Sequence, residues 1–144
     1  MNYNIVEEIY NRNFGSEITY KRDYFNQLTY TVGMKDFADT LEAHWFIDTI
    51  ISHLSTVIKD SATTEDYFYV VELVVKSNNE ATLDIFREGY IDNEYQEHIL
   101  VATQKIPYVD LPVEAGEELT TYKFYLIKTA EAPAKFMLLL PKEY

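Results

Sequence analysis

The segment YFYVVELVVKSNNEATLDIF, residues 67–86, decides the fold. Its apolar side chains recur at every second position, the pattern of a β-strand with one buried face. A turn at residues 77–79 brings two such runs together. It pairs Val75 with Ala81, Leu73 with Leu83 and Val71 with Ile85, and Tyr69 extends the first apolar set. Both apolar sets then share one face, so the segment predicts a β-hairpin in this register.

The residues before the hairpin have a helical period. Apolar side chains recur three and four residues apart from Met34 to Ile58. The pattern leaves open whether this region is one helix or two with a break near Thr40; threonine is a favourable N-cap, and one 25-residue helix would be long. A shorter amphipathic helix is expected in NIVEEIYNRNF, with Ile5, Val6 and Ile9 on one side and Gly15 ending it.

Three further strands are expected after the hairpin, in EHILVATQKI, TTYKFYLIK and KFMLLL, with YVDLPVEAGEE as a loop between the first two. Helices followed by antiparallel strands indicate an α+β fold. We expect N-terminal helices packed on one face of an antiparallel meander sheet of about four to five strands. No repeat or linker divides residues 1–144, which predicts a single domain.

The length and composition exclude several classes of protein and of site. A chain of 144 residues buries roughly 68% of its unfolded surface on folding, enough for a full core. Without cysteine there is no disulfide, thiolate zinc site or cysteine nucleophile. The first residues, MNYNIVEEIY, lack the pattern of a secretory signal, and no apolar run reaches membrane-spanning length. The expectation is a soluble cytoplasmic protein.

The net charge of −12 is concentrated in one region. Residues 60–118 contain 14 acids and three bases, a net charge of −11. Such a surface repels phosphate backbones and attracts basic proteins, so direct nucleic-acid binding is not expected. The alternative is that acidity only keeps the protein in solution.

The outer face of the predicted hairpin carries acids. In the register above Glu72 lies opposite Asp84, which is destabilising for like charges. Tyrosine set among carboxylates suits an interface with a basic partner, although a solvated sheet face is the plainer interpretation. The candidate partner-binding residues are Glu72, Glu80, Asp84, Glu88, Tyr90, Asp92, Glu94, Tyr95 and Glu97.

The stretch LEAHWFIDTI, residues 41–50, offers an alternative site. His44 and Asp48 stand four residues apart on a helix and can meet, as in half of a catalytic triad or a metal shell. A helix-surface ion pair explains the same spacing. Trp45 could line a ligand pocket, but a large aromatic residue on a helix more commonly packs the helix against a sheet. No motif for metal, calcium or phosphate is present, and we predict neither a metal nor a cofactor.

The chain also resembles a small family of bacterial, phage and plasmid proteins classified as a domain of unknown function. The resemblance covers residues 29–144 and rests on three motifs, although the acidic middle is less similar. The matching residues are Tyr30, Thr31, Gly33, Trp45, Phe46, Ile47, Asp48, Pro112, Leu140, Pro141, Glu143 and Tyr144. The sequence departs from the pattern at Val32, His44 and Lys142. The resemblance implies no activity, but it implies a mobile-element context, in which small proteins often bind host machinery.

Three functional hypotheses remain. The leading one is a small acidic, non-enzymatic binding protein of phage or mobile-element origin. It would dock on a basic, nucleic-acid-binding host defence protein, as an inhibitor or DNA mimic of the anti-CRISPR kind. The second is a small hydrolase or metal-dependent enzyme that uses His44 and Asp48. The third is a structural protein that self-associates through exposed tyrosines.

Overall fold

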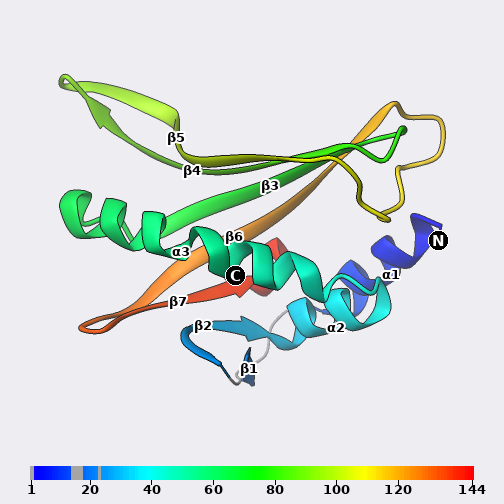
Figure 1. Cartoon of the computed structure of the whole chain (residues 1–144), viewed down its shortest axis with the longest axis horizontal. Helices are drawn as coiled ribbons and strands as arrows, with labels where there is room; N and C mark the ends of the chain where they lie inside the picture. Colours follow the sequence, from blue (N-terminus) through cyan, green and yellow to red (C-terminus); the bar gives the residue numbers. More distant parts are fainter. Residues whose placement is uncertain (1, 14–17, 23) are drawn as a thin grey trace.

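The computed structural model describes residues 2–13, 18–22 and 24–144 (Figure 1). Within these residues the chain forms three α-helices, seven β-strands and one short 3-10 helix. In chain order they are α1 (Asn4–Arg12), β1 (Thr19–Arg22), β2 (Phe25–Thr31), α2 (Val32–Thr40), α3 (His44–Thr64), β3 (Phe68–Lys76), β4 (Ala81–Ile91), β5 (Glu94–Ile106), β6 (Leu119–Glu131), β7 (Ala134–Leu139) and η1 (Pro141–Glu143).

The described strands form one mixed sheet in the order β1-β2-β7-β6-β3-β4-β5. Neighbouring strands are antiparallel except β2 and β7, which are parallel. The α+β class is therefore confirmed, but four to five antiparallel strands was too few. The five expected strands are present, and β1 and β2 were missed. β1 has four residues and none of them is buried, so its sequence carries almost no strand signal.

The register of the β3–β4 hairpin is confirmed. Val75 lies opposite Ala81, Leu73 opposite Leu83 and Val71 opposite Ile85. All six side chains are at most 4% exposed, because this face of the sheet packs against the helices. The opposite face carries Glu72, which lies across from Asp84 as expected.

The central helical region consists of two helices, with a break after Thr40, which decides between the two alternatives that the sequence left open. Thr40 is not the N-cap of the second helix, as its residue type had indicated, because it ends α2 and donates a hydrogen bond to Asp36. α3 instead begins after Ala43, which caps it with no side-chain bond, and Glu42 takes a positive φ of 53° in the connection. α3 runs on to Thr64, beyond the expected end at Ile58.

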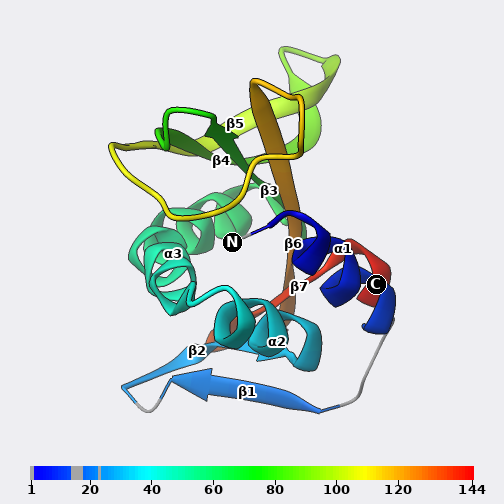
Figure 2. The ribbon, with the colours of Figure 1, turned by 90° about the vertical axis from the view of Figure 1, so that its right-hand side faces the viewer.

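The helices cover one face of the sheet, and α3 runs along it in front of the strands (Figure 1). In the turned view, α2 and α3 lie next to each other, with β1 and β2 below them, β4 and β5 above and β6 to the right (Figure 2). The expected N-terminal helix is α1, which buries Val6 and Ile9 completely. It ends at Arg12, and the expected stop at Gly15 falls outside the described residues.

Aromatic rings fill the centre of the core. The Phe46 and Phe124 ring centroids lie 4.5 Å apart, and Phe37 packs edge-on against Phe124 at 5.2 Å. Trp45 is half-buried and contacts Phe46 edge-on. The stretch LEAHWFIDTI therefore presses α3 against the sheet, as the spacing indicated. No helix in the described part of the chain is long and apolar enough to cross a membrane.

Candidate partner-binding surface

The predicted partner-binding residues fall into two groups along the hairpins. We call Glu72, Glu80 and Asp84 the proximal acids, since they lie over the body of the sheet on β3, β4 and the turn between them. We call residues 88–97 the distal hairpin, which is the outer end of β4, the turn and the start of β5. It contains the other predicted residues, Glu88, Tyr90, Asp92, Glu94, Tyr95 and Glu97.

The proximal acids are interspersed with lysines. Lys123 of β6 lies opposite Glu72 on the side away from Asp84. Thr103 donates a hydrogen bond of 2.6 Å to Asp84, which reduces the cost of placing two carboxylates opposite each other. Over the body of the sheet the acids therefore have basic and hydrogen-bonding neighbours.

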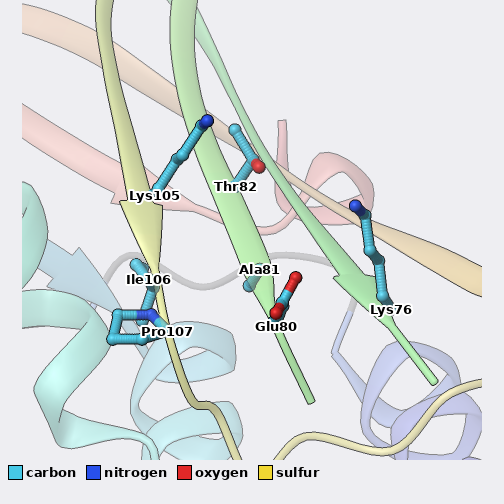
Figure 3. Close-up of a pocket in the computed structure, with 7 residues that line it drawn as sticks. All are labelled: Lys76, Glu80, Ala81, Thr82, Lys105, Ile106 and Pro107. Carbon is cyan, nitrogen blue, oxygen red and sulfur yellow. The ribbon is translucent and has the colours of Figure 1, made fainter. Parts of the chain in front are cut away.

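A shallow cavity of about 310 Å³ lies beside the turn between β3 and β4, next to the end of β5 (Figure 3). Lys76 of β3 and Lys105 of β5 stand on either side of Glu80 in it. Together with Lys123, these lysines equal the proximal acids in number. This part of the outer face is close to neutral, and charge alone gives it no preference for a basic partner.

The distal hairpin departs from the sheet through two irregularities. The β4–β5 register shifts between Ile85 and Phe86 and again between Arg87 and Gly89. Such bulges bend a strand pair and increase its twist. The tip curls away from the other strands (Figure 1). It closes at Asp92 and Asn93, whose φ values of 52° and 66° suit a tight two-residue hairpin turn.

Arg87 connects the root of the distal hairpin to the end of α3. It is 9% exposed and faces the helix layer, where it bonds both carboxylate oxygens of Asp60 at 2.7 and 3.2 Å. Asp66 lies 3.2 Å from the same guanidinium. Tyr69 donates a hydrogen bond of 2.7 Å to Asp60, and burial together with this bond raises the pKa of Tyr69. Two acids of the negative region are therefore paired internally, which their sequence positions did not reveal.

Beyond Arg87 the negative charge has no partner of opposite sign within the hairpin. Residues 88–97 contain four carboxylates and neither lysine nor arginine, and none of them is buried. Tyr90 and Tyr95 are 73% and 49% exposed, with ring centroids 5.6 Å apart. The Tyr95 hydroxyl donates a hydrogen bond to Glu88. The distal hairpin is thus an exposed acidic and aromatic projection.

His44 and Asp48, the alternative site, are each paired elsewhere. His44 Nε2 lies 2.8 Å from Asp39. Asp48 accepts two bonds from Arg22, at 3.0 and 2.9 Å, and one from Tyr24. The bonds from Arg22 are the largest of the effects that lower the pKa of Asp48. No group of three or more metal-binding side chains occurs among residues 2–13, 18–22 and 24–144.

A separate cluster lies where η1 meets the start of α2, and we call it the clasp. Thr31 donates a hydrogen bond of 2.6 Å to Glu143 and also caps α2 by accepting one from the Met34 amide. Oε2 of Glu143 accepts from the Gly33 amide at 2.9 Å, and Oε1, the oxygen that Thr31 bonds, also accepts from the Leu140 amide at 3.1 Å. A Cβ built on Gly33 would lie 2.5 Å from Cδ of Glu143, so only glycine leaves room for this carboxylate.

A comparison with protein families finds a match over residues 5–144 to a family of unknown function, DUF6876. The chain belongs to DUF6876. Comparisons with curated proteins and with solved structures each found no match.

The DUF6876 match agrees with the resemblance stated from the sequence. Two of the motifs on which that resemblance rested, around Thr31 to Gly33 and around Leu140 to Glu143, meet in the clasp. The third contributes Phe46 and Ile47 to the core. These residues hold elements together in this DUF6876 chain. The distal hairpin lies outside them.

Proposed function

We propose that this protein is a small, non-enzymatic binding protein of the cytoplasm that docks on a basic, nucleic-acid-binding partner through its distal hairpin. The main observation in support is that residues 88–97 present four carboxylates and two exposed tyrosines without any lysine or arginine. Exposed carboxylates on a projecting hairpin attract and orient a basic surface, and the tyrosine rings supply contact area.

The negative charge of the distal hairpin indicates the class of protein that it would bind. A surface that binds nucleic acid is lined with lysine and arginine, and carboxylates can occupy the positions of phosphates on it. We propose a nuclease or another nucleic-acid-binding protein of a host defence system, which fits the mobile-element context implied by the sequence resemblance. The protein would then act as an inhibitor that competes with nucleic acid.

Matched neutralisation of the two acidic groups tests this function. The distal variant combines Asp92→Asn, Glu94→Gln and Glu97→Gln. The proximal variant combines Glu72→Gln, Glu80→Gln and Asp84→Asn and changes the net charge equally. The wild-type chain first captures a partner from host lysate, and the purified partner is then titrated with each variant by calorimetry at several salt concentrations.

We expect the distal variant to bind about tenfold more weakly, since three exposed charge contacts are each worth a few tenths to 1 kcal/mol. The proximal variant should bind within about twofold of wild type. Duplex DNA should compete with the wild-type complex. Equal losses in the two variants, unchanged binding in the distal one, or a partner that DNA does not displace would reject the proposal.

Self-association is a second candidate, favoured by strand β5. It lies at an edge of the sheet and carries Leu100, which is 52% exposed. An edge strand can pair with the same strand of a second copy, although its bulges oppose this. Sedimentation across a concentration series tests it: a rise in mass with concentration supports pairing, and a constant monomer mass rejects it.

A further inference from the structure

Two hollows meet at the root of the distal hairpin and share the side chains of Asp66 and Glu88 as a common wall. The larger, about 620 Å³, lies on the side of Tyr90 and Tyr95. The smaller, about 350 Å³, lies on the side of Tyr67, Phe68 and Tyr144. We call the pair the root groove. Carboxylates stand in its middle and aromatic rings at both ends.

The root groove carries excess negative charge. Arg87 lines it, but this guanidinium already bonds Asp60 and lies 3.2 Å from Asp66. The lining therefore holds two carboxylates, Asp66 and Glu88, against one cation whose charge is already shared with Asp60 outside the groove. Glu88 is exposed, and the bond from the Tyr95 hydroxyl leaves it with further lone pairs to offer. A cationic guest is the charge-complementary occupant.

The rings around these carboxylates are open to solvent. Tyr67 is 60% exposed and Tyr144 is 71% exposed. Tyr144 is held edge-on against Phe68, with ring centroids 5.2 Å apart, and against Tyr125 at 5.7 Å. Its ring therefore has a fixed place beside the carboxylates. Exposed aromatic faces next to carboxylates suit a planar cation that stacks and donates hydrogen bonds at the same time.

The molecule already contains one guanidinium bonded to carboxylates at this place. Arg87 is bonded to Asp60, with Asp66 beside it and the Tyr69 hydroxyl on the same Asp60 oxygen. An arginine entering from outside would meet Asp66 and Glu88 from the solvent side. Arginine fits better than lysine, because its planar fork can bond a carboxylate in two places while its face rests on a ring.

We propose that the root groove binds an arginine side chain of the partner. This inference rests on the proposed function and adds a specific contact to it: the distal carboxylates attract the basic surface, and the groove takes one of its arginines between aromatic rings. Such a buried aromatic and arginine contact is the usual form of an interface hot spot.

The test uses three short peptides as probes, acetyl-Gly-Arg-Gly-amide and its lysine and citrulline counterparts. Each is titrated into the 15N-labelled protein and followed by NMR. We expect the arginine peptide to shift amide signals of residues 66–68, 87–90, 95 and 144. The lysine peptide should bind several-fold more weakly, and the uncharged citrulline peptide should cause no saturable shift. Equal shifts with all three peptides, or arginine shifts spread over all acidic surfaces, would overturn the proposal.

Variants then locate the contact. Glu88→Gln should weaken arginine-peptide binding about fivefold, whereas Glu80→Gln, an equal charge change at the proximal acids, should leave it unchanged. Tyr67→Ala should weaken it and Tyr67→Phe should restore it, because stacking needs the ring and not the hydroxyl. If Glu80→Gln is as damaging as Glu88→Gln, the effect is general charge attraction and the groove is rejected.

The same variants separate this inference from the proposed function. If the distal variant loses partner binding while Glu88→Gln and Tyr67→Ala retain it, the arginine site is rejected and the acidic docking surface is supported. Partner binding that none of these changes affects would remove both.

Discussion

The clasp and the distal hairpin use carboxylates in opposite ways. In the clasp, one carboxylate, Glu143, accepts bonds from Thr31, Gly33 and Leu140, residues more than a hundred positions away or in the adjoining turn. In the distal hairpin, four carboxylates stand exposed without a basic neighbour in the hairpin. The first arrangement stabilises the fold and the second leaves charge available to a partner. The residues of the clasp are therefore different from those proposed to bind.

The largest expected effect on stability concerns Arg87, at the junction of the distal hairpin with α3. Arg87→Met removes the guanidinium that joins the hairpin root to α3 and leaves Asp60 and Asp66 close together without their cation. We expect the free energy of unfolding to fall by about 3 kcal/mol, because breaking a buried ion pair leaves uncompensated charge.

Urea denaturation measures this change. The double variant Asp60→Asn/Arg87→Met should recover part of the lost free energy of unfolding, since Asp60→Asn removes one of the two carboxylates left without a cation. A loss below about 1 kcal/mol in the single variant would mean that the hairpin root does not depend on this ion pair.

The next effect belongs to the clasp. Gly33→Ala places a methyl group against Glu143 and should lower the free energy of unfolding by about 2 kcal/mol, because the carboxylate must leave at least one of its donors. Glu143→Ala should cost a similar amount. Since both variants break the same contact, the double variant should cost much less than the sum of the two in a double-mutant cycle. Additive losses would show that the two residues act independently.

The smallest effect is expected in the distal hairpin. The Asp92→Asn, Glu94→Gln and Glu97→Gln variant should change the free energy of unfolding by less than about 0.5 kcal/mol, since exposed side chains without partners contribute little to stability. Relief of repulsion between the acids would give the change a stabilising sign. If the free energy of unfolding, measured by the same urea denaturation, falls by more than about 1 kcal/mol, these carboxylates have a structural role. They would then not differ from Glu143 of the clasp in this respect.

The sequence predicted what depends on local periodicity. The register of the β3–β4 hairpin follows from alternating apolar residues such as Leu73 and Leu83, because a slip by one residue would expose them all. The helical region was also predicted, but its pattern left open whether it breaks into α2 and α3, and the N-cap role given to Thr40 was wrong.

The remaining features depend on contacts between distant segments. β2 pairs with β7 across more than a hundred residues, and only Leu28, Tyr30 and Thr31 of β2 are buried, so no local pattern marks the strand. The lysines beside the proximal acids come from other strands, as Lys123 opposite Glu72 shows. A count of charges along the chain could identify the acidic region, but not which acids the fold neutralises.

The bulged departure of the distal hairpin has a consequence for how this protein can evolve. Apart from Gly89, which lies against Arg87, and the turn residues Asp92 and Asn93, the side chains of residues 88–97 are exposed and support no part of the interior. Substitutions among them can therefore change the charge of this surface while the clasp and the core stay as they are.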